Sequence, residues 1–393
     1  MRTIGVDERR RRLAVRHRLS SPARNVEDAV EAVVGLHSSD PTSVYLSAWA
    51  RVRSFGADRL EAALYERRTL VRMLGMRRTL FVVPRSVAPA MAEACAATYA
   101  AAERRRLVQM LEDQGVIEPG RGARWIERVL EETMAAVERR GEATARELTR
   151  DVPELGEKLT FGEGKTWAGT MGVSTRVLFL LATEGRIVRA RPLGAWTSGQ
   201  YRWAPTEAWL GTALDRLDLR TASAEVVRRY LRAFGPVTRT DVRWWTGWTA
   251  KATDQALEDV RAVEVRVDDG LAYVAPGDGK RTPPIRKRWV ALLPGLDPTV
   301  MGWKERGWYF GEHERTLFDR AGNAGPTVWV DGRVVGGWTQ RKDGEVVFAL
   351  LDRVDAASHR AIREECHRLE AWLADVRVRA RFATPFEREL ASR

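Results

Sequence analysis

His37, Ser39 and Asp40 lie within four residues of one another, just before a predicted helix. Asp40 followed by Pro41 is a helix start signal, because aspartate accepts hydrogen bonds from the first amides and proline lacks the N–H that would have no partner. His37 and Ser39 precede it in extended chain, where alternate side chains point the same way. The segment therefore holds a polar pair at a rigid helix entrance as a candidate site, and Asp40 is largely committed to capping that helix. The alternative is structural: Ser39 caps the helix and His37 binds a backbone carbonyl.

Two basic segments are candidates for binding phosphates. Arg77, Arg78 and Thr79 lie at the tip of a predicted hairpin, where they could contact phosphates or form a solvated turn. Further along the chain, WKERGW at 303–308 mixes aromatic and basic side chains, as nucleic-acid channels do. Because tryptophans at these spacings are as often core residues, Lys304 and Arg306 are the predicted DNA contacts.

Two other motifs are rejected as sites. The GKT at 164–166 ends like a phosphate-binding loop, but that loop would need glycine where Leu159 stands. His359, Cys366, His367 and Glu370 fall near one face of a predicted helix, where the fixed charge of Arg363 would oppose a cation. We therefore predict a solvated surface helix there, and neither nucleotide hydrolysis nor a metal site.

Composition favours a folded protein that binds a polyanion. The 393-residue chain is 44% hydrophobic and 30% charged, with a net charge of +12 and a pI near 10.2. Arginine accounts for 58 of the 65 basic residues, which suits phosphate recognition, although GC-rich codon usage explains the ratio equally well. Two cysteines and no apolar run of ~18 residues indicate a cytoplasmic protein of two to four domains, with nucleic acid as the leading partner.

A weak internal repeat organises the middle of the chain. GEATAREL (141–148) and GPVTRTDV (235–242) share the spacing of a capping box, with Thr144 and Thr238 as N-caps and Glu147 and Asp241 as their partners. Amphipathic helices precede both, and a helix and a β-hairpin follow both. In the first copy, the predicted helices are 125–139 and 174–183, and the predicted strands are 187–191 and 201–203, with the hairpin tip at 194–199. In the second copy, the predicted helices are 222–233 and 251–260, and the predicted strands are 263–267 and 271–274, with a turn at 268–270. This order of elements is typical of a winged helix.

The flanking regions complete the predicted fold. Helices over 26–34, 41–52 and 57–66 precede a hairpin of 70–74 and 79–83, and an Ala-rich helix covers 86–112. Strands at 289–293, 327–330, 333–338 and 346–351 precede a helix over 356–374. We therefore predict a mainly α fold with β structure (α+β). Its parts are three winged-helix units (1–85, 121–215 and 216–285), a linking helix (86–120) and a C-terminal β-rich portion with a final helix (286–393).

The segment VVGLHSSDPTSVYLSAWAR (33–51) resembles the catalytic segment of the winged-helix AlkZ/YcaQ-type DNA glycosylases. MRRTLFVV (76–83), LDPTVMGWK (296–304) and VDGRVVGGW (330–338) resemble other segments of that family. The resemblance implies tandem winged helices around a DNA-binding channel, no cofactor, and removal of bulky or cross-linking N7-alkylguanine lesions, often as self-resistance in bacteria that make genotoxic natural products. The family's best-known members carry Gln-x-Gln or Gln-x-Asp where this chain has His37 and Ser39.

Two functions follow from these observations. One is a monomeric, monofunctional DNA glycosylase that acts on double-stranded DNA containing alkylated guanine, with His37 and Ser39 handling water. N7 alkylation makes the base cationic and a good leaving group, so no strong general acid is needed, and Asp40 could stabilise the developing sugar cation. The other is a non-catalytic winged-helix regulator or lesion sensor, which would need an exposed recognition helix and usually a dimer. The predicted helix at 251–260 carries few exposed basic residues, mainly Lys251. Base reading by this helix is therefore poorly supported, which favours the glycosylase.

Overall fold

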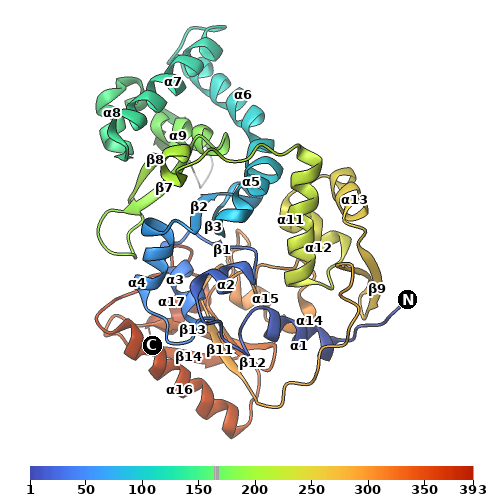
Figure 1. Ribbon diagram of the computed structural model, residues 1–393. Coiled ribbons are helices and arrows are strands. Elements are labelled where there is room, and N and C mark those ends of the chain that lie inside the picture. Colours follow the sequence, from blue (N-terminus) through green and yellow to red (C-terminus); the bar gives the residue numbers. More distant parts are fainter. Residues whose placement is uncertain (163, 165–167, 393) are drawn as a thin grey trace. The chain divides into compact units, whose positions relative to one another are not determined.

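The computed structural model describes residues 1–162, 164 and 168–392, so Lys165 and Thr166 of the GKT motif lie outside the described residues. The chain forms two compact units (Figure 1). The larger unit contains Met1–Leu70, Phe81–Pro84 and Ser223–Arg393, and the smaller contains Val71–Leu80 and Arg85–Ala222. The fold is mixed α and β with small antiparallel sheets, as predicted.

The smaller unit carries the first copy of the predicted repeat. Its Thr144–Glu147 capping box is present, with the Glu147 amide donating to the Thr144 hydroxyl at 3.2 Å. Ile126, Leu130 and Val137 of the first helix pack with Val177 and Leu181 of the third in one hydrophobic core. In chain order the elements are α7 (Gly122–Arg140), β4 (Ala143–Thr144), α8 (Ala145–Asp151), α9 (Val173–Thr183), β7 (Ile187–Pro192) and β8 (Tyr201–Pro205), with strand order β4-β8-β7.

Other elements of the smaller unit depart from the predicted pattern. The predicted helix over 86–112 is divided into α5 (Ala88–Met91), a π-helical turn (Ala92–Ala96) and α6 (Ala97–Asp113). A hairpin of β5 (Lys158–Phe161) and β6 (Gly169–Gly172) was not predicted, nor was the short α10 (Thr206–Leu210). β2 (Leu70–Leu74) leads to the predicted turn at Met76–Arg78.

The second copy of the repeat follows the same order. Its Thr238–Asp241 capping box is also present, and Val237 bridges to Tyr273 as a short first strand. The elements are α11 (Leu219–Phe234), α12 (Arg239–Thr246), α13 (Ala250–Asp259), β9 (Val263–Val267) and β10 (Gly270–Val274).

The C-terminal part of the larger unit contains the four predicted strands. They form an antiparallel sheet of β11 (Val290–Leu293), β12 (Thr327–Val330), β13 (Arg333–Gln340) and β14 (Val346–Leu350) in that order. The predicted helix α16 (Ala356–Leu373) packs on it, and Figure 1 shows α16 in red running below the sheet. The short helices α14 (Gly307–Phe310) and α15 (Glu314–Leu317) and the final helix α17 (Pro385–Ser392) were not predicted.

The N-terminal part of the larger unit contains the candidate site. Its elements are α1 (Val6–Arg16), α2 (Val26–Glu31), β1 (Leu36–His37), α3 (Pro41–Trp49), α4 (Ala57–Glu61), a π-helical turn (Ala62–Glu66) and β3 (Leu80–Pro84). The helices were expected, apart from α1, whereas the strand β1 was not.

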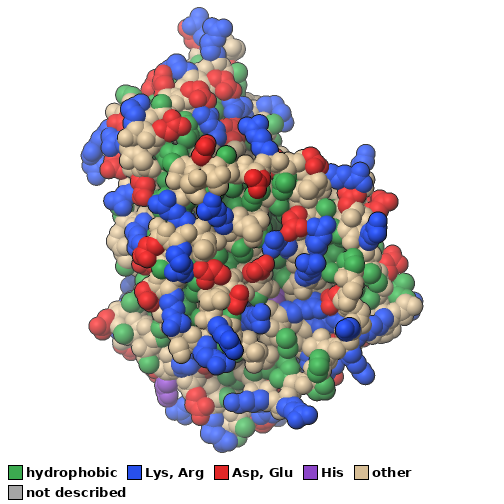
Figure 2. Space-filling model, in the orientation of Figure 1, with side chains coloured by type: hydrophobic (Ala, Val, Ile, Leu, Met, Phe, Trp, Pro, Cys, Tyr) green, Lys and Arg blue, Asp and Glu red, His purple; other side chains and the backbone are tan. Residues whose placement is uncertain are grey.

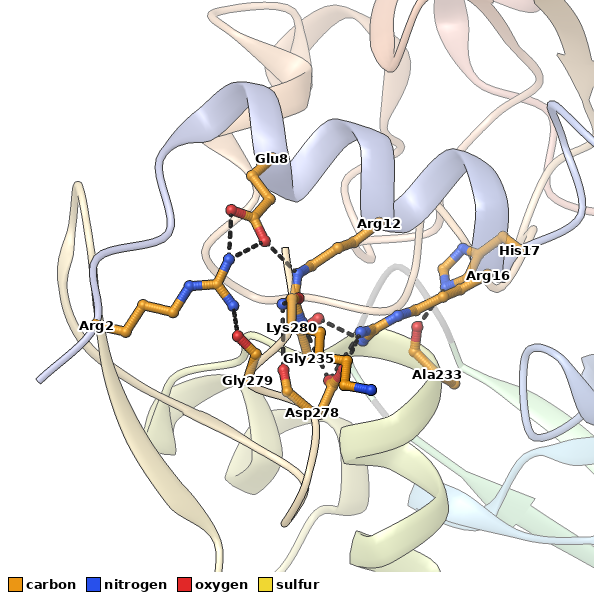
Figure 3. A network of polar contacts seen from close by, with 10 residues as sticks. All are labelled: Arg2, Glu8, Arg12, Arg16, His17, Ala233, Gly235, Asp278, Gly279 and Lys280. Carbon is orange, nitrogen blue, oxygen red and sulfur yellow. Dashed lines mark hydrogen bonds and ion pairs between the residues drawn. The ribbon is translucent and has the colours of Figure 1, made fainter. Parts of the chain in front are cut away.

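Basic residues of α1 form hydrogen bonds and ion pairs within the larger unit and do not belong to an exposed arm. Arg9 and Arg12 are 2% and 1% exposed. The Arg12 guanidinium bonds Glu8, Asp278 and the Lys280 carbonyl, and the Arg16 guanidinium binds both oxygens of Asp278 at 2.7 and 2.8 Å (Figure 3). These contacts bind α1 to the chain segment that follows β10.

We expect Asp278→Ala to lower the free energy of unfolding by about 1–3 kcal/mol, because the buried Arg12 guanidinium loses a charged partner. Urea unfolding would measure the change. Asp7→Ala is the matched control, since Asp7 is 86% exposed and 4.0 Å from Arg10. Equal stability of the two variants would contradict the prediction.

The remaining charge is spread over the surface. Figure 2 shows Lys and Arg side chains over the whole visible face, interspersed with Asp and Glu. Among the described residues no helix is both long and apolar enough to cross a bilayer.

Candidate active site

β1 holds His37 against β3 in the larger unit. Leu36 pairs with Val82 and His37 with Phe81, and the His37 ring lies edge-on to the Phe81 ring at 5.1 Å. A β-carbon on Gly35 would lie 2.8 Å from a Val83 methyl and 3.0 Å from the Val82 carbonyl, so only glycine allows this close approach. The imidazole is therefore fixed on a strand instead of on the extended turn that was predicted.

Asp40 is the N-cap of α3, as predicted. Its Oδ1 accepts from the Thr42 amide at 2.8 Å and from the Thr42 hydroxyl at 2.7 Å. Its Oδ2 accepts from the Arg381 amide at 2.7 Å. Because both oxygens are bonded and the side chain is 3% exposed, Asp40 is a fixed group at the start of α3.

His37 and Ser39 contact each other through the backbone. The Ser39 amide donates to His37 Nδ1 at 3.4 Å, a long bond that requires Nδ1 to be unprotonated. His37 is 5% exposed and Ser39 is partly exposed. Within the described residues the Ser39 hydroxyl makes no hydrogen bond. The pair thus places a nitrogen lone pair and an available hydroxyl two residues apart.

The Asp297 loop after β11 anchors α3. Ser43 donates to the Gly295 carbonyl at 2.7 Å and Ser47 to Asp297 Oδ2 at 2.7 Å. Arg51 forms a bidentate pair with Asp297 at 2.6 and 2.8 Å, and both side chains are fully buried. These three side chains recur every four residues on α3 and its continuation, so one polar face of this helix is bonded to this loop.

His17 extends this network as a neutral side chain. Its Nε2 donates to the Ala233 carbonyl at 3.2 Å (Figure 3). Its Nδ1 accepts from the Thr299 hydroxyl at 2.9 Å. Thr299 also accepts from Arg51 at 2.6 Å. Burial, and then the nearby Arg51 charge, hold the pKa of His17 well below its usual value of 6.5.

The lowered pKa of His17 predicts loss of stability in acid. Below pH 6.5 the unfolded chain binds a proton that the folded chain does not, so stability is present above pH 6.5 and declines below it. Between pH 6.5 and 5.5 we expect the wild type to lose about 1 kcal/mol more than His17→Gln. Urea unfolding at both pH values would measure this difference, and parallel losses would contradict it.

A C-terminal strap, residues 376–382, contacts the site and was not predicted. Gln340 bonds the Val376 carbonyl and the Val378 amide at 3.2 and 2.9 Å, which places the strap along β13. Besides its amide bond to Asp40, Arg381 directs a guanidinium to the Ser39 carbonyl at 3.4 Å. In the sequence, the alternation of Arg377, Arg379 and Arg381 with shorter residues could have indicated an extended segment here.

The predicted contacts Arg77, Arg78 and Thr79 form a tight turn in the smaller unit. Arg77 and Arg78 have φ of 51° and 59°, and the Thr79 hydroxyl donates to the Met76 carbonyl at 2.9 Å. Arg78 pairs with Glu103, and its side chain remains 47% exposed. Arg78 is thus partly neutralised but accessible.

Lys304 and Arg306 differ in exposure. Lys304 is exposed, and its backbone amide donates to Asp241 at 2.8 Å. Arg306 is 3% exposed, with its guanidinium between the Trp244 and Phe318 rings. The position of Arg306 does not support the predicted DNA contact, because aromatic rings from two other segments cover it. Trp303 and Trp308 are buried, as is typical of core indoles.

The histidine-containing face of α16 has structural contacts. Glu370 accepts from the Val346 amide at 2.7 Å, and burial raises the pKa of the Cys366 thiol to about 12. No cluster of three or more potential metal ligands is found in the described ranges.

Two comparisons with known proteins find matches to this chain. The family profile "DNA glycosylase AlkZ-like" matches residues 30–372, which include the His37–Asp40 segment and the Asp297 loop. Among solved structures, the Streptomyces sahachiroi DNA glycosylase AlkZ has a TM-score of 0.72 at 20% identity, covering 98% of this chain and 100% of that chain, so the two share a fold. A search of curated proteins finds no match. The family match spans most of the sequence, and the chain therefore belongs to the AlkZ-like DNA glycosylase family.

Proposed function

We propose that this glycosylase hydrolyses the N-glycosidic bond of N7-alkylguanine in double-stranded DNA. The observation that carries the proposal is the contact of His37 Nδ1 with the Ser39 amide, because it leaves Nδ1 as a lone-pair acceptor beside the Ser39 hydroxyl. The 3.4 Å bond is weak, so a water molecule can replace the amide as the partner of Nδ1. The Ser39 hydroxyl then orients this water.

The proposed reaction needs a base and a negative field, but no strong acid. N7 alkylation gives the purine a positive charge, so the C1′–N9 bond breaks with its electron pair moving to the base, which leaves neutral. Water oxygen bonds to C1′ as His37 Nδ1 takes its proton, and solvent later removes that proton. Asp40, held by Thr42 and Arg381, supplies a fixed carboxylate toward the cationic sugar. Because water is the nucleophile, the enzyme is monofunctional.

The proposed DNA contacts come from three exposed cations and from the turn at 77–79. Lys304 and Arg381 in the larger unit and Arg78 in the smaller are exposed and are proposed to bind phosphates, with the half-buried Arg77 and Thr79 of the same turn assisting, and so to fix the register of the duplex. The two repeat copies, with their helix, helix, helix and hairpin order, support winged-helix modules. The protein is proposed to act as a monomer, and the resemblance of the His37 segment to glycosylases of genotoxin producers supports a bulky adduct and a role in self-resistance.

A single assay tests this function. Duplex DNA with N7-methylguanine, or with a bulky N7 adduct, at one position is incubated with the protein and then heated in alkali. We expect strand breaks at the lesion and none in unmodified duplex. Absence of breaks with both lesions would overturn the proposed substrate.

A further inference from the structure

A small cavity lies between α3, β13 and α17 in the larger unit. Its volume is about 20 Å³, and its walls include Asp40 and Ser43, Thr339 and Gln340, and Glu387. A cavity of this size holds one water molecule when polar groups surround it. The cavity therefore connects the cap of the catalytic helix with a carboxyl group from the last helix.

Glu387 is buried at this cavity with one oxygen unsatisfied. Its side chain is 7% exposed, and within the described residues Oε2 has no hydrogen-bond partner. The backbone of Thr384 bonds the carboxyl group, and the Glu387 amide donates to the Thr384 hydroxyl at 3.1 Å. A β-carbon on Gly337 would lie 2.6 Å from the Phe386 ring, so α17 docks closely on β13 and keeps Glu387 in place.

Capping of α17 accounts for only one of the two oxygens. Asp241 has the same position in its own capping box and is fully buried, but its carboxylate accepts from the amides of Thr238, Lys304 and Glu305. In the part of the chain that the structure describes, Glu387 Oε2 has no such donor. A buried carboxylate without them is costly, which favours the protonated acid.

Burial and the neighbouring Asp40 charge both favour the neutral form of Glu387. Burial is the main reason that the pKa of Glu387 is raised to about 7; the Thr384 backbone hydrogen bond opposes this, the Asp40 charge adds to it, and Arg388 has the smallest, opposing effect. The β13 residues that line the cavity, Trp338, Thr339 and Gln340, are all neutral, and β14 carries no ionisable group. On α15, Glu314 pairs with the Arg306 guanidinium, and Arg315 is the remaining charge. In the strap, Arg381 directs its guanidinium to Ser39.

We propose that Glu387 is a positioning residue for the active site: as a neutral acid it donates, through one water in the shared cavity, to Asp40. This bond fixes the Asp40 carboxylate against the Arg381 amide, and so fixes the strap on which the Ser39 backbone rests. The effect on catalysis rests on the proposed function, whereas the effect on the strap does not.

Hydrogen exchange of the strap tests the positioning role without any enzyme assay. In Glu387→Met the donor is lost, and we expect amides 376–382 to exchange at least about tenfold faster than in the wild type. Glu387→Gln keeps an N–H donor and is expected to restore most of the protection. Helix α7, in the smaller unit, serves as the internal reference, and the exposed Glu389→Gln as the matched control. Unchanged exchange of the strap in Glu387→Met would overturn the inference.

Single-turnover rates of base release test the catalytic consequence. We expect Glu387→Met to be about 10- to 100-fold slower, since small misplacements of catalytic groups have effects of this size, and Glu387→Gln to recover most of the loss. The wild-type rate should decline above pH 7, where Glu387 ionises and stops donating, and Glu387→Gln should lack this decline. Identical pH profiles of wild type and Glu387→Gln would overturn the inference. No release by the wild type would instead overturn the proposed substrate, and the exchange experiment would then decide the inference.

Discussion

Replacement of His37 by alanine is expected to lower the single-turnover rate of N7-alkylguanine release by about 100- to 10,000-fold, which is the usual contribution of a general base. The imidazole is fixed by strand pairing to Phe81, and its Nδ1 is an acceptor beside the Ser39 hydroxyl. Alanine removes the acceptor, while the backbone at positions 36 and 37 can keep β1 paired with β3. The alkali-cleavage assay on duplex with one N7-methylguanine measures the change.

Two controls separate chemistry from binding and folding. Affinity of His37→Ala for the same duplex should change less than about threefold, because the loss is confined to the transition state. His359→Ala, which removes an exposed imidazole on α16, should keep the wild-type rate. Full activity of His37→Ala would show that another group activates water, and the assignment of the base would then be wrong.

Removal of the Asp297 carboxylate is expected to lower the free energy of unfolding by about 3–5 kcal/mol, because Asp297→Ala leaves the Arg51 charge buried without its partner. The same substitution takes acceptors from the Ser47 hydroxyl and the Thr299 amide, so α3 loses its anchor to the loop after β11. Urea unfolding measures the loss.

The double variant distinguishes a buried charge from a general packing defect. Arg51→Met with Asp297→Leu should be less destabilised than the sum of the single variants, because no uncompensated charge remains. Glu345→Gln, which removes a partner of Arg341 at a 54% exposed side chain, should change stability by at most about 1 kcal/mol. Additive losses at Arg51 and Asp297 would contradict the ion-pair explanation.

Local chemistry explains which elements were predictable. The capping boxes at Thr144 and Thr238, the Asp40 cap and the strands of the C-terminal sheet each depend on residues a few positions apart, and all are present. Helix α1 was missed because its run of arginines is typical of a solvated segment, although Arg12 and Arg16 bind Asp278 more than 260 residues away. Helix α17 is short, and its buried Glu387 breaks the expected apolar face.

The sequence alone determined the family, the capped start of α3 and the nearness of His37, Ser39 and Asp40, because motifs and caps act over neighbouring residues. Tertiary structure decided which groups are buried and what they bind. It placed Arg51 on Asp297, 246 residues along the chain, covered Arg306 with rings from distant segments, and brought Arg381 and Glu387 to Asp40. Burial and long-range pairing depend on how the whole chain packs, and the spacing of residues along the sequence does not predict this packing.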